Sequence, residues 1–179
     1  MFTNGSCHGL GKHFYPDGSV YNGDFQNDLP HGWGTLKHAD GSLYIGDFQK
    51  GYSQGVGTMV YRHGDKYEGL WDQGKRHGVG TMTYLTKDGS VEKIYKGNWR
   101  NDQKCGEGKT IWKMITSTIS YGGQYKNDLP NGKGLMIYWN NEQYAGFWVD
   151  GLRHGYGEQS LPDGRMIYEG IWANDKYEG

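Results

Sequence analysis

The chain has 179 residues, with 32 Gly, 15 Tyr, 7 Trp and 5 Phe but only 4 Pro, and a formal net charge of −1. Glycine does not recur at every third position and aromatics occur throughout, which excludes a collagen triple helix and a Gly/Ser linker. The low net charge and the apolar area of Tyr and Trp argue against disorder and indicate a folded, aromatic-rich β protein.

The start of the chain, its hydropathy and its cysteines indicate a cellular compartment. No window approaches the 18 apolar residues of a membrane-spanning helix, and the start MFTNGSCHGLGKH lacks the apolar region of a signal peptide. Cys7 and Cys105 stand in unrelated contexts, so neither a disulfide framework nor a cysteine zinc site is indicated. We expect a soluble, cytoplasmic protein.

Two short patterns recur along the chain at a fixed distance. The pattern Tyr-x-Gly-x-aromatic begins at Tyr21, Tyr44, Tyr67, Tyr95, Tyr121, Tyr144 and Tyr168. The pattern Gly-x-Gly begins at Gly9, Gly32, Gly55, Gly78, Gly106, Gly132 and Gly155. From Gly32 on, each Gly-x-Gly begins 11 positions after the preceding Tyr, whereas the next Tyr follows each Gly-x-Gly after 12 to 17 positions. Length variation is therefore confined to one link, which we expect to be a surface turn.

Both links contain residues that accept positive φ in hairpin turns. The variable link carries Asp17-Gly18, Asp40-Gly41, His63-Gly64, Asp88-Gly89, Asn140-Asn141 and Asp163-Gly164. The fixed link carries Asn27-Asp28, Lys50-Gly51, Gln73-Gly74, Asn101-Asp102, Asn127-Asp128, Asp150-Gly151 and Asn174-Asp175. Each unit of about 23 residues is therefore predicted to be two short strands and two turns.

Alternation along a strand predicts where the core lies. Tyr67, Gly69 and Trp71 share one face of the first strand of their unit, and Gly80 shares one face of the second strand with Met82. Glycine inside a strand is unfavourable unless a large ring approaches closely, so we expect rings to lie over glycines. Valine at Gly69 or Gly80 should then unfold a unit.

The predicted fold is all-β: an elongated, single-layer, twisted antiparallel sheet of tandem β-hairpins, with residues 1–179 forming one array of about seven units. Gly9 has no upstream Tyr, and Gly179 falls where a new Gly-x-Gly should begin, so both ends carry half-units. Either the array continues in a longer chain, or the half-units pair with another chain or cap the sheet.

The segments YEGLWDQGKRHGVGTMTY (67–84) and YAGFWVDGLRHGYGEQ (144–159) closely resemble the MORN (membrane occupation and recognition nexus) repeat. The resemblance covers essentially the whole chain, with departures at 121–125, where Tyr replaces Trp, and at 111–120, which lacks an Asp-Gly turn. It implies a single-sheet array that acts as a binding or dimerisation platform in cytoskeletal, ciliary and membrane-junction proteins. In some members the array is an accessory part of a lysine methyltransferase or a lipid kinase, and phospholipid binding has been proposed.

No pattern indicates an enzyme or a cofactor. His8, His31, His77 and His154 precede Gly-x-Gly at a repeat position, but units about 10 Å apart are too distant to share a zinc ion. The run from Gly69 to Arg76 lacks the Ser or Thr of a phosphate-binding loop. With 19 basic and 20 acidic residues and no basic cluster, membrane phospholipid is a weak prospect and nucleic acid is not expected.

The second strands offer an interaction surface on the face away from the rings. Its expected partner-binding residues are Leu10, Phe14, Trp33, Val56, Val60, Val79, Leu135, Ile137 and Tyr156. Either a partner covers these side chains or sheet twist covers part of them internally. We expect a non-enzymatic scaffold, in a cytoskeletal or ciliary (axonemal) assembly, that binds a protein partner such as a helical segment or another MORN chain. The alternative is a membrane-recruiting or accessory array of a larger enzyme.

Overall fold

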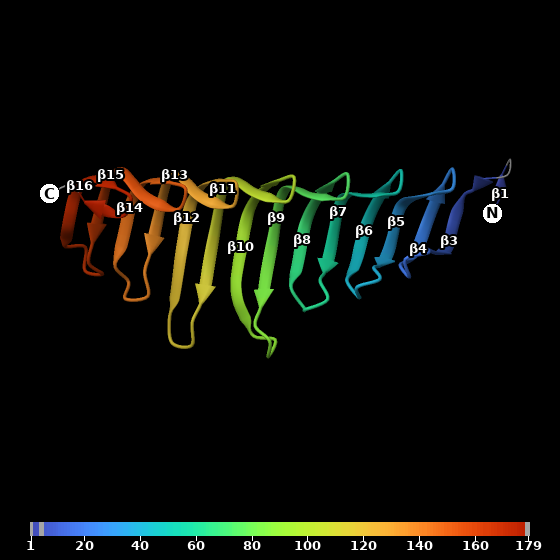
Figure 1. Ribbon diagram of the computed structural model, residues 1–179, viewed down its shortest axis with the longest axis horizontal. Helices are drawn as coiled ribbons and strands as arrows, with labels where there is room; N and C mark the ends of the chain where they lie inside the picture. Colours follow the sequence, from blue (N-terminus) through green and yellow to red (C-terminus); the bar gives the residue numbers. More distant parts are fainter. Residues whose placement is uncertain (1, 4–5, 178–179) are drawn as a thin grey trace.

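The computed structural model describes residues 2–3 and 6–177. One open sheet of 15 antiparallel strands follows a separate two-stranded hairpin, and every strand of the sheet pairs with its sequence neighbours (Figure 1). The strands are β1 Phe2–Thr3, β2 Ser6–Cys7, β3 Gly9–Phe14, β4 Val20–Gln26, β5 Leu29–Lys37, β6 Leu43–Gln49, β7 Tyr52–Val60, β8 Lys66–Asp72, β9 Lys75–Leu85, β10 Val91–Arg100, β11 Gln103–Lys113, β12 Thr118–Lys126, β13 Leu129–Ile137, β14 Gln143–Val149, β15 Leu152–Ser160, β16 Met166–Ala173 and β17 Lys176–Tyr177. The predicted all-β fold of tandem hairpins is confirmed, and the described residues contain no helix that could cross a membrane.

The two kinds of turn lie at opposite long edges of the ribbon (Figure 1). At the fixed-turn edge Asn27 and Asp28 both have positive φ, 50° and 66°. At the variable-turn edge Gly18 has φ 91°, and the Asp17 carboxylate accepts a hydrogen bond from the Ser19 amide at 2.8 Å. The β9–β10 and β11–β12 hairpins extend farthest at this edge, so the insertions lengthen hairpins without disturbing the sheet.

The repeat tyrosines lie over a ladder of glycines. Cross-strand register places Gly57 opposite Gly69, and Gly69 opposite Gly80. The Tyr67 ring covers Gly69 and Gly80, because a Cβ atom at Gly80 would lie 2.2 Å from the Tyr67 hydroxyl oxygen. That hydroxyl donates a hydrogen bond to the Leu70 carbonyl at 2.9 Å. Tyr44 covers Gly57 in the same way. The expected arrangement of rings over glycines is confirmed.

The rings of successive units interlock into one continuous core. Tyr67 contacts Trp71 of its own unit and Trp99 of the next, edge to face, with centroids 5.2 and 5.4 Å apart. The Trp71 indole also donates a hydrogen bond to the Gly57 carbonyl of the preceding unit at 3.2 Å. Because each ring bridges two units, the core consists of one row of rings along the ribbon.

The unit that departs from the pattern keeps this packing by a different hydrogen bond. Tyr125 occupies the place of Trp and contacts the rings of Tyr95 and Tyr121, both at 5.2 Å. Its hydroxyl shares a hydrogen bond of 2.7 Å with Thr110, which stands where the preceding unit has Met82. A buried polar pair therefore replaces an indole and a thioether.

Candidate protein-interaction face

The two faces of the sheet differ in what covers them. We call the face that carries the repeat tyrosines the inner face and the opposite one the outer face. All nine residues predicted for partner binding alternate with inner-face residues and so lie on the outer face. Their side chains are exposed, from 82% for Leu10 to 37% for Val60, except that Ile137 is half-buried.

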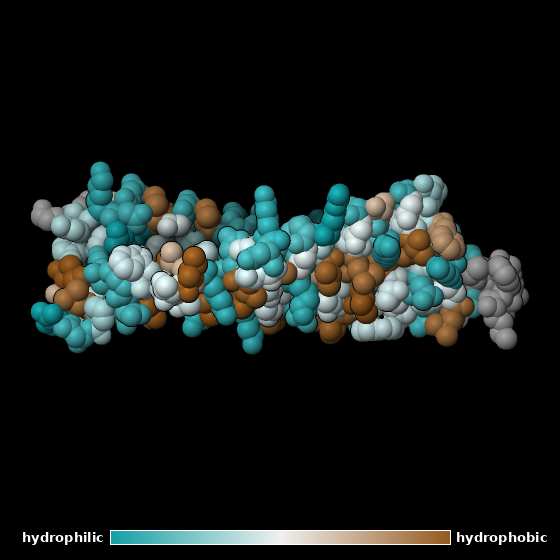
Figure 2. Space-filling model, turned by 90° about the horizontal axis from the view of Figure 1, so that it is seen from below, coloured by the Kyte–Doolittle hydropathy of each residue, from teal (hydrophilic) through white to brown (hydrophobic). Residues whose placement is uncertain are grey.

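These nine residues do not form a single patch. Leu10, Phe14, Trp33, Val56, Val60 and Val79 lie on β3 to β9, and we call them the N-terminal group. Leu135, Ile137 and Tyr156 lie on β13 and β15 and form the C-terminal group. Asn98, Glu107 and Gln124 separate the groups on β10 to β12. Figure 2 views the ribbon from the variable-turn edge, and the hydrophobic residues at this edge lie in separate groups along the ribbon.

Outer-face residues of the first strands add to both groups, and the sequence prediction missed them. Leu70 lies opposite Val56 and is 40% exposed, and Ile171 lies opposite Tyr156 and is 48% exposed. Phe147 is also exposed, opposite Lys133. The sequence did carry a signal for these residues. They stand between the Gly and the second aromatic of Tyr-x-Gly-x-aromatic, and because side chains alternate along a strand, a residue at that position faces away from the core.

Charged side chains cover part of the inner face. The Arg76 guanidinium lies 4.4 Å from the Trp99 ring centroid and is held by Asp102, with its Nε 3.0 Å from the carboxylate. Arg153 repeats the arrangement, 4.1 Å from the Trp172 ring centroid. Burial lowers the pKa of Lys104, whose Nζ lies 4.8 Å from the Tyr95 ring centroid. These cations restrict access to the ring row.

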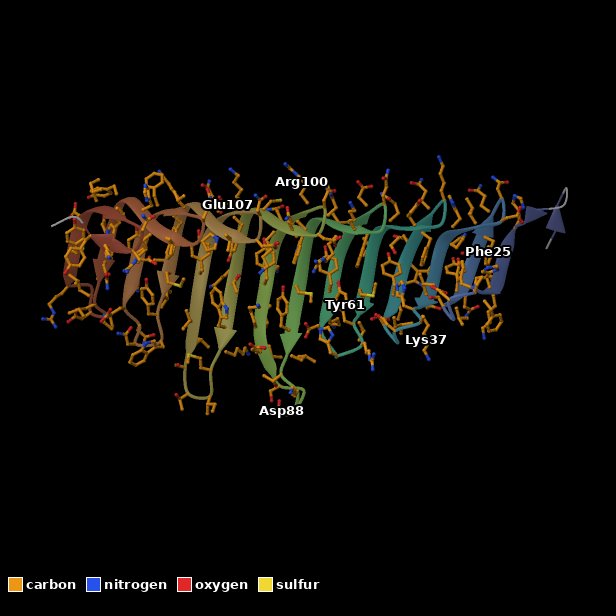
Figure 3. The ribbon with its side chains drawn as sticks, viewed as in Figure 1. Phe25, Lys37, Tyr61, Asp88, Arg100 and Glu107 are labelled. Atoms are coloured by element: carbon orange, nitrogen blue, oxygen red, sulfur yellow. The ribbon has the colours of Figure 1, made fainter. Side chains whose placement is uncertain are left out.

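Two hollows lie outside the apolar groups. A cleft of about 830 Å³ at the fixed-turn edge is lined by polar residues that include His77, Asn98 and Glu107. Figure 3 shows Glu107 at this edge, whereas Asp88 lies at the tip of the β9–β10 hairpin on the opposite edge. A pocket of about 370 Å³ beside the β11–β12 turn is lined largely by apolar residues such as Trp112. Among residues 2–3 and 6–177 no group of His, Cys, Asp and Glu is placed to hold a metal ion.

An open sheet of hairpins that share one row of rings defines a β-repeat protein. The MORN repeat model matches residues 1–20, 21–43, 44–66, 67–88, 95–114, 121–140, 144–164 and 168–179, so the chain belongs to the MORN repeat family. MORN repeat-containing protein 3 of Xenopus laevis is 32% identical over 95 residues, which cover 50% of this chain and 39% of that protein. Alsin of Rattus norvegicus and of Homo sapiens are each 30% identical over 95 residues, 49% of this chain and 6% of alsin.

Proposed function

We propose that this chain is a non-enzymatic structural scaffold that binds a protein partner along its outer face, in a cytoplasmic cytoskeletal or ciliary (axonemal) assembly. The observation that carries the proposal is the N-terminal group. Trp33, Val56 and Val79 are each exposed by more than half on strands whose other face is packed against the ring row. Exposed aromatic and aliphatic side chains on a rigid platform are typical of protein interfaces.

The shape of this surface favours an elongated partner. Trp33, Val56, Leu70 and Val79 lie at similar heights on β5, β7, β8 and β9 and form an apolar stripe across the strands. Asp47 of β6 interrupts this stripe, since it faces Trp33 and accepts a hydrogen bond from the Val56 amide. Four strand spacings span about 19 Å, the length of a helix of about 13 residues. A partner helix or an extended chain segment along this stripe would bury these side chains.

Affinity capture from cell extract tests the proposal. The variant Trp33→Ala/Val56→Ala/Val79→Ala should lose cytoskeletal or axonemal proteins that the wild-type chain retains. The matched control Tyr52→Ala/Leu129→Ala/Leu152→Ala removes exposed apolar side chains near the fixed-turn edge and should retain them. Equal capture by both variants would show that the N-terminal group is not the docking surface.

A second candidate is an accessory array of a larger protein, enzyme or membrane-recruiting factor. It is favoured by the match to alsin, in which the similar segment is 6% of the protein. An antibody against the array, used on native extract, would detect a species far larger than 20.3 kDa if the array is part of a longer chain. Flotation with phosphatidylserine vesicles would separately detect membrane recruitment.

A further inference from the structure

Two pairs of like charges lie directly opposite each other on the outer face. Lys96 of β10 faces Lys109 of β11, and Glu158 of β15 faces Glu169 of β16. All four side chains are exposed, and within the described part of the chain none of them forms an ion pair. The Glu169 carboxylate accepts a hydrogen bond from the Tyr156 hydroxyl, which does not neutralise its charge. Like charges directly opposite in neighbouring strands destabilise a sheet, and no opposite charge in the described part of the chain offsets either pair.

Both pairs belong to one row across the sheet. Cross-strand pairs continue the row from Lys109 through Gly122, Leu135 and Ala145 to Glu158. We call the row from β10 to β16 the central row. In strand order it reads two lysines, glycine, leucine, alanine and two glutamates, so its two halves have opposite charge around Leu135.

Neither a close contact nor a positive φ requires glycine at position 122. A Cβ atom there would meet nothing within 4 Å, and its φ is not positive, whereas a Cβ at Gly134 would lie 2.3 Å from the Tyr121 hydroxyl. Because the side chains at Gly122 and Ala145 are absent or small, the surface is lower on both sides of Leu135, which is 39% exposed. Such a profile allows a second surface to approach closely at the middle of the row.

From this arrangement we infer that the outer face of β10–β16 binds the same face of a second copy of this chain, about a two-fold axis that runs along β13. This axis reverses the order of the strands in the second copy relative to the first, so that β10 faces β16 of the second copy. Lys96 then meets Glu169 of the second copy, and Lys109 meets Glu158 of the second copy. Leu135 and Ile137 meet their own counterparts on the axis. The inference rests on the proposed function, since it assigns a partner to the C-terminal part of the same outer face.

Neighbouring side chains and the available area fit this pairing. Lys133 also lies on β13, but its Nζ is 5.5 Å from the Phe147 ring centroid, so its charge leans toward β14 and off the axis. The overlap spans about 34 Å across seven strands and about 20 Å along them. The two copies together then bury about 1,400 Å² of accessible surface, which is the size of a specific protein interface. Closed two-fold pairs of this kind are the commonest oligomers.

The first test is the mass of the wild-type chain in solution. Sedimentation equilibrium at about 100 µM should give twice the chain mass of 20.3 kDa, since interfaces of this size bind at micromolar or lower concentration. A monomer at this concentration overturns the inference.

Charge reversal tests the register. Glu158→Lys/Glu169→Lys and Lys96→Glu/Lys109→Glu should each weaken self-association by more than about 100-fold, because like charges then face each other across the pair. An equimolar mixture of the two variants should form a mixed dimer, which also shows that both are folded. The control Lys12→Glu/Glu68→Lys reverses exposed charges at the same height on β3 and β8, outside the overlap, and should stay dimeric.

A distance measurement separates this pairing from other dimers. Spin labels on cysteines introduced at Glu68, with Cys7 and Cys105 replaced by Ser, should lie about 48 Å apart, because β8 of the two copies is ten strands apart. A dimer without that distance, or dimers that survive charge reversal, overturns the inference. Charge reversal leaves the N-terminal group intact, so failed partner capture and failed self-association are separate results.

Discussion

At the scale of single residues, the repeat tyrosines set the size of the side chains opposite them. The Tyr67 hydroxyl and ring would lie 2.2 to 2.5 Å from a Cβ atom at Gly80, closer than any carbon can pack. Gly80→Ala should therefore lower the free energy of unfolding by about 2 kcal/mol or more, measured by urea denaturation. Gly122→Ala, where the added Cβ meets nothing within the chain, should change the free energy of unfolding of the monomer at low concentration by less than about 0.5 kcal/mol. Equal effects of the two substitutions would contradict the ring-over-glycine packing.

Burial of these hydroxyls makes stability depend on alkaline pH. Desolvation raises the pKa of Tyr21 and of Tyr144 from 10.0 to about 12. The folded state binds these hydroxyl protons more tightly than the unfolded chain does. The contribution of the protonated hydroxyls to the free energy of unfolding is therefore complete below about pH 10 and is lost as the pH rises toward 12. The urea midpoint, followed by circular dichroism, should fall across this interval.

The variant Tyr144→Phe isolates one of these groups. It keeps the ring but removes the hydroxyl that donates to the Phe147 carbonyl, so the pH dependence between 10 and 12 should be shallower than in the wild type. A midpoint that stays constant up to pH 12 in the wild type would refute the link between burial and ionisation.

Part of the core could be predicted from residues alone. Gly69 and Gly80 in strand interiors need a reason, and strand alternation places Tyr67 and Trp71 on the same face, so rings over glycines follow from the sequence. The stacking of Arg76 on Trp99 could not be predicted. The register of β8 and β9 shifts between Gly69 and Trp71, because residues 77–79 of β9 face the single residue Leu70 of β8. This shift brings Arg76 opposite Trp71, and strand alternation carries no sign of it.

At the scale of strands and turns, hydrogen bonds join neighbouring units at both edges. At the variable-turn edge the Ser42 hydroxyl accepts a hydrogen bond from the Arg62 amide at 3.1 Å. At the fixed-turn edge the Asp102 carboxylate accepts from the Arg76 amide at 3.0 Å. These bonds lie outside the sheet ladder and span more than one strand, so they hold neighbouring hairpins in one orientation.

The Tyr125–Thr110 pair gives a prediction at this scale. Tyr125→Trp should lower stability by about 1 to 2 kcal/mol, because the buried Thr110 hydroxyl then loses its partner. Thr110→Met should do the same to the Tyr125 hydroxyl. The double variant restores the usual tryptophan and methionine of the repeat and should be more stable than either single variant. Additive losses in a double-mutant cycle would show that the two residues act independently.

This compensation lies beyond what the sequence pattern indicates. The pattern marks Tyr125 as a departure from Trp, but its partner Thr110 stands 15 positions earlier on another strand. Their contact depends on the register of β11 and β12, which pairs Thr110 with Tyr121 in the hairpin whose turn lacks Asp-Gly. The sequence shows that Tyr125 departs from the repeat pattern. Only the strand register shows that Thr110 compensates for it.

At the scale of the whole molecule, the same dependence on register limits the prediction of the outer face. The nine predicted residues were second-strand positions, and each does lie on that face. The charge pattern of the central row was not predicted, because Lys96 and Lys109 are brought together only by the pairing of β10 with β11. The local period gives the face of each residue, whereas unequal hairpins leave cross-strand neighbours undetermined until the sheet is seen.

The linear order of units also predicts how the ribbon unfolds. Substantial contacts join strands adjacent in sequence, so cooperativity passes through each unit in turn. Tyr95 is fully buried in the middle of the row and contacts Trp99 and Tyr125. Tyr95→Ala removes both contacts at a cost of about 3 to 5 kcal/mol, and the units on either side lose the packing that couples them.

Hydrogen exchange with increasing urea should resolve the consequence. In Tyr95→Ala, peptides from β3–β8 and from β12–β16 should lose protection in two separate transitions, whereas the wild-type chain loses both together. Tyr168→Ala is the matched control, because it removes a ring near the end of the row and should expose β16 early while the remaining units unfold as one. If Tyr95→Ala still unfolds in a single transition, coupling along the ribbon passes through the backbone ladder, and the row of rings is not what joins one unit to the next.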